Sequence, residues 1–163
     1  MKKNNEVKIR KAKEEDYLVV DRLYNLNYEL LHKNIPNEYK MPPKPTLPRG
    51  TFINMVEDRK LLVLVAEVNK LVVGVIYGEI EKEEADEWTQ NRHRLYISEL
   101  SVLPEYANEG VGTQLIQEAE HWAKGKKAKY ISILTYDFNM AAISFYKKNG
   151  YKPYSIQLNK RIE

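Results

Sequence analysis

The sequence predicts an α/β fold in one domain, with a mixed, mostly antiparallel central sheet and helices on both of its faces. A length of 163 residues suits one domain with a proper core, spanning 1–163. The patterns run strand, helix, short helix, three strands, helix, strand, helix, strand, an order that favours a sheet covered by helices. With 43% hydrophobic and 30% charged residues, the composition is ordinary for a globular protein.

The first half of the chain supplies one strand and two helices. Residues 6–12 alternate as a short strand, and residues 14–33 carry apolar side chains at helical spacing. Residues 34–50 hold five of the seven prolines, which predicts an irregular excursion. Residues 51–59 form one further short helix in this interpretation.

A hairpin and a third strand follow. Residues 60–67 and 71–80 flank a turn, and a charged loop is expected over 81–94. In the strand 95–102 the apolar phase slips by one residue, from Leu95 and Ile97 to Leu100 and Val102. Such a slip predicts a β-bulge near Ser98 and Glu99, a feature that often lies beside active sites. The alternative is a regular strand that is apolar on both faces.

The last third predicts a helix from Val111, a strand over 129–136, a second helix and a final strand over 151–158. The second helix has Asn139 as its N-cap and Gly150 as its C-terminal stop.

Composition and charge exclude several classes of function. A net charge of +3 from 26 basic and 23 acidic residues is too balanced for a nucleic-acid surface. The apolar runs are too short to span a bilayer, and no secretory signal is visible, so we expect no membrane partner and a cytoplasmic protein. With no cysteine and three scattered histidines, we expect no metal site and no cysteinyl intermediate.

Gly110 and Gly112 stand where a loop becomes a helix. The N-terminus of a helix suits a phosphate, and glycine lets an anion approach the backbone. The pattern is neither the dinucleotide fingerprint nor a P-loop. A loop glycine followed by a packing glycine is the alternative explanation.

Two stretches carry a family resemblance: "LSVLPEYANEGVGTQLIQEAEHWAK" (100–124) and "NMAAISFYKKNGY" (139–151). Together they resemble the Gcn5-related N-acetyltransferase (GNAT) superfamily, which binds acetyl coenzyme A. The second stretch matches the family spacing at Asn139, Ala142, Phe145, Tyr146, Lys148, Gly150 and Tyr151. One departure is Ala107, where the family usually has Arg or Gln, and Glu109 adds an acid to the same loop.

The resemblance implies an acetyl-CoA-dependent N-acetyltransferase that moves the acetyl group directly to a primary amine within a ternary complex. Backbone at 100–102 would pair with the pantetheine arm, and the amides of 108–113 would hold the pyrophosphate. The implied cofactor-binding residues are Leu100, Ser101, Val102, Ala107, Asn108, Glu109, Gly110, Val111, Gly112, Thr113, Asn139, Ala142, Phe145 and Tyr146.

The resemblance also suggests catalytic roles. Glu99 is the candidate general base, because a carboxylate interrupting an apolar strand is unusual; the alternative is a glutamate that faces solvent. Tyr146 is the candidate general acid toward the thiolate leaving group, with a core aromatic as its alternative. The Leu100 N–H is a candidate oxyanion donor, or else makes an ordinary ladder hydrogen bond.

The acceptor is not fixed by the sequence. Acidic residues cluster between Glu79 and Glu87, and a small cationic amine, which they would attract, is slightly favoured over a peptide amine. A non-catalytic acetyl-CoA sensor or interaction module is the competing function, and a homodimer is compatible with the resemblance.

Overall fold

The structure is a computed structural model that describes residues 6–162. Its five-stranded sheet has the order β1-β2-β3-β4-β5, formed by β1 (Val7–Lys11), β2 (Leu61–Val68), β3 (Leu71–Glu83), β4 (Arg92–Val102) and β5 (Tyr130–Ile133). The longer helices are α1 (Tyr17–Asn34), α2 (Arg49–Glu57), α3 (Val111–Gly125) and α4 (Met140–Lys148). Single 3₁₀ turns cover Glu14–Asp16 and Pro104–Tyr106.

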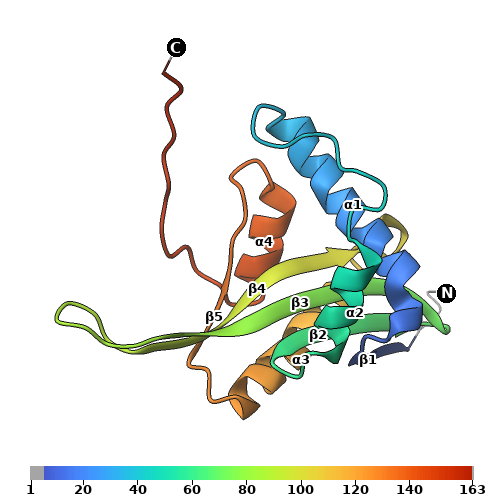
Figure 1. Cartoon of the computed structure of the whole chain (residues 1–163), viewed down its shortest axis with the longest axis horizontal. Helices are drawn as coiled ribbons and strands as arrows, with labels where there is room; N and C mark the ends of the chain where they lie inside the picture. Colours follow the sequence, from blue (N-terminus) through green and yellow to red (C-terminus); the bar gives the residue numbers. More distant parts are fainter. Residues whose placement is uncertain (1–5, 163) are drawn as a thin grey trace.

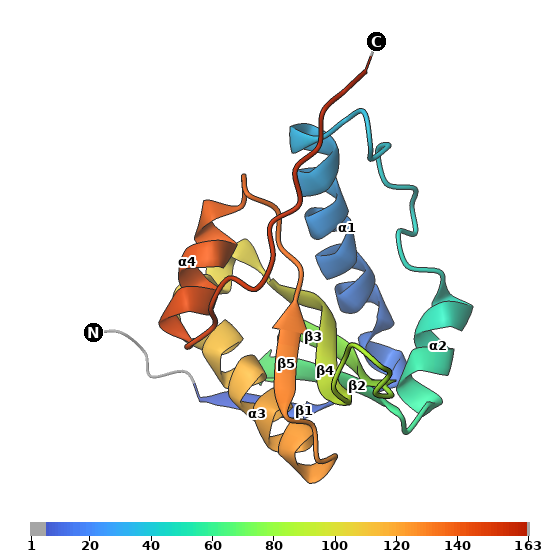
Figure 2. The same cartoon turned by 90° about the vertical axis from the view of Figure 1, so that its left-hand side faces the viewer.

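The elements form three layers (Figure 1). Figure 2 shows α1 and α2 on one face of the sheet, with α3 and α4 on the other. Strands β1 to β4 are antiparallel neighbours, whereas β5 runs parallel to β4 after the crossover through α3. The predicted fold class, a mixed and mostly antiparallel sheet covered on both faces, is confirmed.

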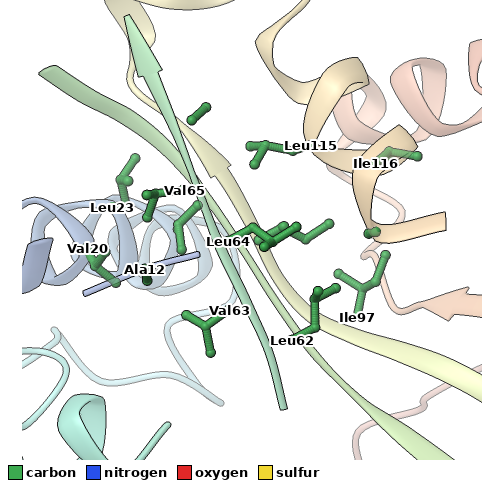
Figure 3. Close-up of a cluster of buried hydrophobic side chains, with 14 of the residues drawn as sticks. Ala12, Val20, Leu23, Leu62, Val63, Leu64, Val65, Ile97, Leu115 and Ile116 are labelled. Carbon is green, nitrogen blue, oxygen red and sulfur yellow. The ribbon is translucent and has the colours of Figure 1, made fainter. Parts of the chain in front are cut away.

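The core lies on both faces of the sheet and fixes the helices against it. Figure 3 shows Val20 and Leu23 of α1 on one side of β2, with Leu115 and Ile116 of α3 on the other. All four side chains are buried, as is Phe52 of α2. Burial of this kind stabilises by roughly 1.5–3 kcal/mol per large apolar side chain, so α1 and α3 hold fixed positions over the middle of the sheet.

The predicted bulge is present in β4. Tyr77 lies opposite Glu99 and the next residue, Gly78, lies opposite Ile97, so Ser98 is the extra residue. Gly78 is needed there, because a Cβ atom would lie 2.6 Å from the Tyr96 carbonyl oxygen. A side chain at position 78 would therefore collide with β4 at the bulge.

Beyond the bulge, β4 and β5 separate. The ladder between them covers only Arg94 to Ile97 of β4 and ends at Ile133 of β5. β4 continues alone on that side to Val102. One edge of residues 98–102 is consequently open, directly after the bulge.

Two sequence predictions are wrong. Residues 151–162 contain no strand, because no neighbour pairs with them among the residues described, although their alternation is strand-like. The expected charged loop over 81–94 is instead mostly hairpin, since β3 extends to Glu83 and β4 begins at Arg92. Cross-strand ion pairs favour this longer hairpin: Arg94 Nε lies 2.7 Å from a Glu81 oxygen.

Candidate active site

The Glu99 carboxyl is the centre of the site. It follows the bulge in β4 and is only 4% exposed. Asn27 Nδ2 donates to Oε2 at 3.0 Å, and the Ser101 hydroxyl donates to Oε1. Burial raises the pKa of Glu99 to about 7, against the opposing effect of these two hydrogen bonds. The alternative of a solvent-facing glutamate is therefore wrong.

Two elements position these partners. Ser101 lies two residues after Glu99 on β4, so both side chains project from the same face of the strand. Asn27 comes from α1, where Tyr24, Asn27 and Tyr28 share one face at i, i+3 and i+4 spacing. Sequence reasoning missed Asn27; an amide within the apolar stripe of an otherwise amphipathic helix was the available signal.

Tyrosines surround the carboxyl. Burial is the main cause of raised pKa values at Tyr24, Tyr28 and Tyr146, and the Glu99 charge is the next cause in each case. Tyr146 comes from α4, is 8% exposed, and packs against the rings of Phe145 and Tyr151. Its phenol is thus protonated at neutral pH and lies near Glu99, an arrangement that suits a proton donor.

The open edge of β4 presents backbone groups beside Glu99. The Leu103 N–H donates to the Val73 carbonyl oxygen on β3 at 2.8 Å. Because alternate residues of an antiparallel strand face opposite neighbours, Glu99 and Ser101 also direct their backbone toward β3. Leu100 and Val102 direct theirs to the edge that β5 has left. Among the residues 100–102 expected to pair with pantetheine, the Ser101 backbone therefore faces β3, whereas Leu100 and Val102 face the open edge.

The loop between β4 and α3 has a special backbone. Asn108 has φ 63° and Gly110 has φ 84°, and Gly110 immediately precedes α3. The amides of the first helical turn, at residues 111–113, have no acceptor within the helix. A Cβ atom at Gly110 would meet nothing within 4 Å, so this side of the loop is open to a bound anion.

Gly112 has a different reason for being glycine. A Cβ atom there would lie 3.1 Å from the Phe145 ring, so the residue lets α3 pack closely against α4. The packing explanation left open by the sequence therefore holds for Gly112. Asn139 caps α4 as predicted, since its side chain accepts from the Ala142 N–H at 3.1 Å.

A line of aromatic rings leads away from Glu99. Tyr28 of α1 makes an edge contact with Tyr39, whose hydroxyl lies 2.8 Å from the Tyr136 hydroxyl. Tyr136 stacks on Phe138. These rings join the proline-rich segment to the segment between β5 and α4, on the α1 side of the carboxyl. No local pattern indicates this contact, which joins residues 97 positions apart.

Most of the acidic residues between Glu79 and Glu87 lie away from Glu99, although Glu79 is opposite Tyr96 beside the bulge. The others lie on the β3–β4 hairpin, which projects away from the rest of the molecule (Figure 1). Arg94 pairs with Glu81, Arg92 pairs with Glu83, and Asp86 accepts from backbone groups of its own turn. Part of the charge of this cluster is paired locally on the hairpin, and the expectation that the cluster attracts the acceptor stays a prediction.

A family model agrees with this geometry. The model described as "Acetyltransferase (GNAT) family" matches residues 24–151, the stretch that holds Glu99, the glycine loop and Tyr146. The chain belongs to this family.

Relatives and solved structures fit the assignment. The protein "Probable N-acetyltransferase san" of Drosophila melanogaster is 33% identical over 69% of this chain and 59% of its own length. The "N-alpha-acetyltransferase" of Sulfurisphaera tokodaii is 27% identical over 93% of this chain and 83% of its own. The match to YobR of Bacillus subtilis, at 36% identity, covers 24% of that protein. The chain therefore spans only part of the length of these two relatives, san and YobR.

Two solved structures share the fold. A mutant of the BH1408 protein from Bacillus halodurans superposes with a TM-score of 0.92 at 24% identity, over 96% of this chain and 99% of its own. The paiA N-acetyltransferase of Thermoplasma acidophilum, solved in complex with coenzyme A, superposes with a TM-score of 0.74 at 22% identity, over 93% of both chains.

Within residues 6–162, none of the helices is sufficiently long and apolar to cross a membrane.

Proposed function

We propose that the protein is an acetyl-CoA-dependent N-acetyltransferase that transfers the acetyl group directly to a primary amine. The observation that carries this proposal is the buried Glu99 carboxyl, with a pKa of about 7, beside the open edge of β4. The GNAT family membership supports the reaction class. The coenzyme A complex of a protein with the same fold supports the choice of cofactor.

The residues of the β4 edge and the following loop fit acetyl-CoA. Leu100 and Val102 offer backbone donors and acceptors to its pantetheine arm, and the amides at 110–113 offer donors to its pyrophosphate. Phe145 and Ala142 are part-buried on α4, beside this loop. The loop has no basic side chain at Ala107, so we assign phosphate binding to backbone amides, with Lys147 or Lys148 as a further source of positive charge.

Each catalytic residue has one task. When bound, acetyl-CoA supplies an activated thioester. Glu99 takes a proton from the acceptor amine, directly or through one water molecule. The Leu100 N–H donates to the carbonyl oxygen as negative charge develops there. Tyr146 donates its phenolic proton to the departing sulfur atom.

For the acceptor we propose a cationic primary amine that approaches along the aromatic line Tyr28, Tyr39, Tyr136 and Phe138. Ring faces attract ammonium groups, and the line ends beside the Glu99 carboxyl, which can remove the proton. In this proposal the aromatic rings, and not the acidic residues of the β3–β4 hairpin, select the acceptor. Both a small polyamine-like molecule and the N-terminal amine of a peptide satisfy this chemistry.

A non-catalytic acetyl-CoA sensor is the second candidate, and the missing basic residue at Ala107 is the observation that favours it. Thiol release from acetyl-CoA, measured with a panel of amines and peptides, separates the two functions. We expect amine-dependent release with at least one cationic acceptor. Thermal stabilisation by acetyl-CoA without release for any amine would favour the sensor. Absence of both effects at millimolar acetyl-CoA would contradict both functions.

A further inference from the structure

The Glu99 carboxyl must pass on one proton in each turnover of the proposed reaction. An ammonium acceptor and acetyl-CoA give an amide, a thiol and one proton, so the balance closes only when that proton reaches solvent. Glu99 is 4% exposed, so little of it meets bulk water. Its partner Asn27 only donates to it, because an amide NH₂ group is a hydrogen-bond donor. A further group must therefore carry the proton away.

Tyr24 lies on the side of Glu99 that the two substrates leave free. In the proposed function acetyl-CoA occupies the open edge of β4, and the acceptor lies along the aromatic line that begins at Tyr28. Tyr24 is one turn before Tyr28 on α1, on the same side of the helix as Asn27. Burial is the main cause of its raised pKa, and the Glu99 charge is the next. The Tyr24 phenol is therefore close to the carboxyl and away from both binding regions.

Tyr77 continues the line from Tyr24 across the sheet. In the ladder between β3 and β4 it is directly opposite Glu99, so both side chains project from the face that α1 covers. After burial and Glu99, Tyr77 is a further cause of the raised pKa of Tyr24. Burial also raises the pKa of Tyr77, and the charges of Glu79 and Asp58 are the next causes. The Tyr77 phenol thus lies between Tyr24 and two carboxylates.

These two carboxylates end the line at the surface. Glu79 comes two residues after Tyr77 on β3, so it projects from the same face of the strand. Asp58 follows the last residue of α2, a helix on the same face of the sheet as α1 (Figure 2). Both acids are exposed, and carboxylate oxygens accept protons. A proton that reaches either of them can pass to water.

The hydroxyl groups of the two phenols are free to take part. Within residues 6–162, neither hydroxyl has a protein hydrogen-bond partner, and the buried side-chain atoms without one are His93 Nε2 and the Tyr151 hydroxyl. The Tyr24 and Tyr77 hydroxyls are therefore not sealed from solvent. A phenol both donates and accepts, and water bridges polar groups that are too far apart for direct contact. The line can thus be continuous through water.

We propose that Tyr24 and Tyr77 form the proton exit of the active site. Glu99 gives the proton taken from the amine to the Tyr24 oxygen, directly or through water, while the Tyr24 hydroxyl proton moves toward Tyr77. Tyr77 repeats this exchange toward Glu79 and Asp58, which release the proton to bulk water. Each phenol gains one proton and loses one, so neither is changed by the cycle. The inference rests on the proposed function, since it needs a proton at Glu99.

The first test measures turnover with and without a soluble proton carrier. Tyr24→Phe and Tyr77→Phe keep the rings and remove the hydroxyls. In dilute buffer each should lower kcat by roughly 10²-fold, the low end for a lost proton-transfer group, with little change in either KM. Added imidazole, with the enzyme-free rate subtracted, should restore kcat in both. The control Tyr130→Phe, at a side chain that is 63% exposed, should keep native kcat.

Two results of this test would overturn the proposal. One is a native kcat in Tyr24→Phe or in Tyr77→Phe. The other is a loss of kcat that imidazole does not restore, because a structural defect is not repaired by a proton carrier.

The second test needs no substrate, so it separates this inference from the proposed function. The infrared absorption of the protonated Glu99 carboxyl, identified as the signal that Glu99→Gln removes, reports its ionisation after a rapid pH rise through about 7. Ionisation should be slower in Tyr24→Phe and Tyr77→Phe than in the native protein and in Tyr130→Phe. This result would support the exit even if no amine gave thiol release. Equal rates in all four proteins would refute it.

Discussion

The Glu99 carboxyl keeps its proton to a pH of about 7 because only 4% of the residue is exposed. Asn27 and Ser101 each donate to it, so its ionised form is costly but still attainable. A carboxyl whose pKa lies near the working pH is well matched to general base catalysis. The same burial makes the residue a stability liability once it ionises.

The first prediction concerns that liability. Between about pH 4.5 and 7 the folded chain holds a proton at Glu99 that the unfolded chain has lost. The free energy of unfolding therefore falls as pH rises through this window, by on the order of 3 kcal/mol. Glu99→Gln should remove this loss, whereas the surface control Glu118→Gln should keep it. Urea denaturation at pH 4.5 and pH 8 measures the difference, and an unchanged pH dependence in Glu99→Gln would refute the burial argument.

Tyr146 tests the proposed proton donor. Tyr146→Phe keeps the ring that packs against Phe145 and Tyr151 and removes only the hydroxyl. We expect kcat to fall by roughly 10²–10⁴ while the melting temperature and the affinity for acetyl-CoA stay close to native. Steady-state thiol release and thermal denaturation provide these values. A native kcat in this variant would show that Tyr146 is a core aromatic residue and not the proton donor.

At the scale of elements, the site depends on the bulge in β4, the separation of β4 from β5 and the close contact between α3 and α4. The bulge was predictable, because Leu95 and Ile97 are out of phase with Leu100 and Val102 in the sequence. The Asn27 contact was not, because its partner lies 72 residues away and local pattern carries no information on such pairs. The strand over residues 151–158 was predicted wrongly for a related reason. Alternation of apolar and polar residues around Tyr154 and Ile156 indicates a strand, but it does not show whether another strand is available to pair with it.

Gly112 tests the contact between α3 and α4. Gly112→Ala places a methyl group 3.1 Å from the Phe145 ring. Overpacking costs about 1–3 kcal/mol, and the higher helix propensity of alanine offsets up to about 1 kcal/mol of that cost. Because the glycine loop leads directly into α3 and Tyr146 lies on α4, the affinity for acetyl-CoA should fall as well. Phe145→Leu in the same chain should restore part of both losses. A double-mutant cycle measures this coupling, and additive effects would show that the two residues do not interact.

At the scale of the whole molecule, the diverging strands and the flanking helices place the two proposed binding regions against one carboxyl. The glycine loop and the open edge of β4 lie on one side of it, and α1 with the aromatic rings lies on the other. The glycines and Tyr146 lie in two local motifs, so the sequence could propose them as the cofactor side, and that role stays a prediction. The sequence could not position the charges of the β3–β4 hairpin, because local pattern does not show that the hairpin projects outward.

This arrangement predicts the kinetic mechanism. Without a cysteine in the chain and with both regions meeting at Glu99, transfer should occur directly between bound substrates. Initial rates at varied acetyl-CoA and acceptor should therefore give intersecting double-reciprocal lines. Parallel lines, or an acetylated enzyme detected by mass spectrometry in the absence of acceptor, would indicate a covalent route instead.

The most direct test of the central claim is the pH profile of kcat/KM for thiol release. The native profile should rise with pH through a limb near 7, where Glu99 ionises and can accept a proton. In Asn27→Ala this limb should move to higher pH, because the lost hydrogen bond lowered the Glu99 pKa. In Glu99→Gln the rate should drop by roughly 10²–10⁴ and the limb should vanish. A Glu99→Gln enzyme with native rate and an unchanged limb would contradict the account.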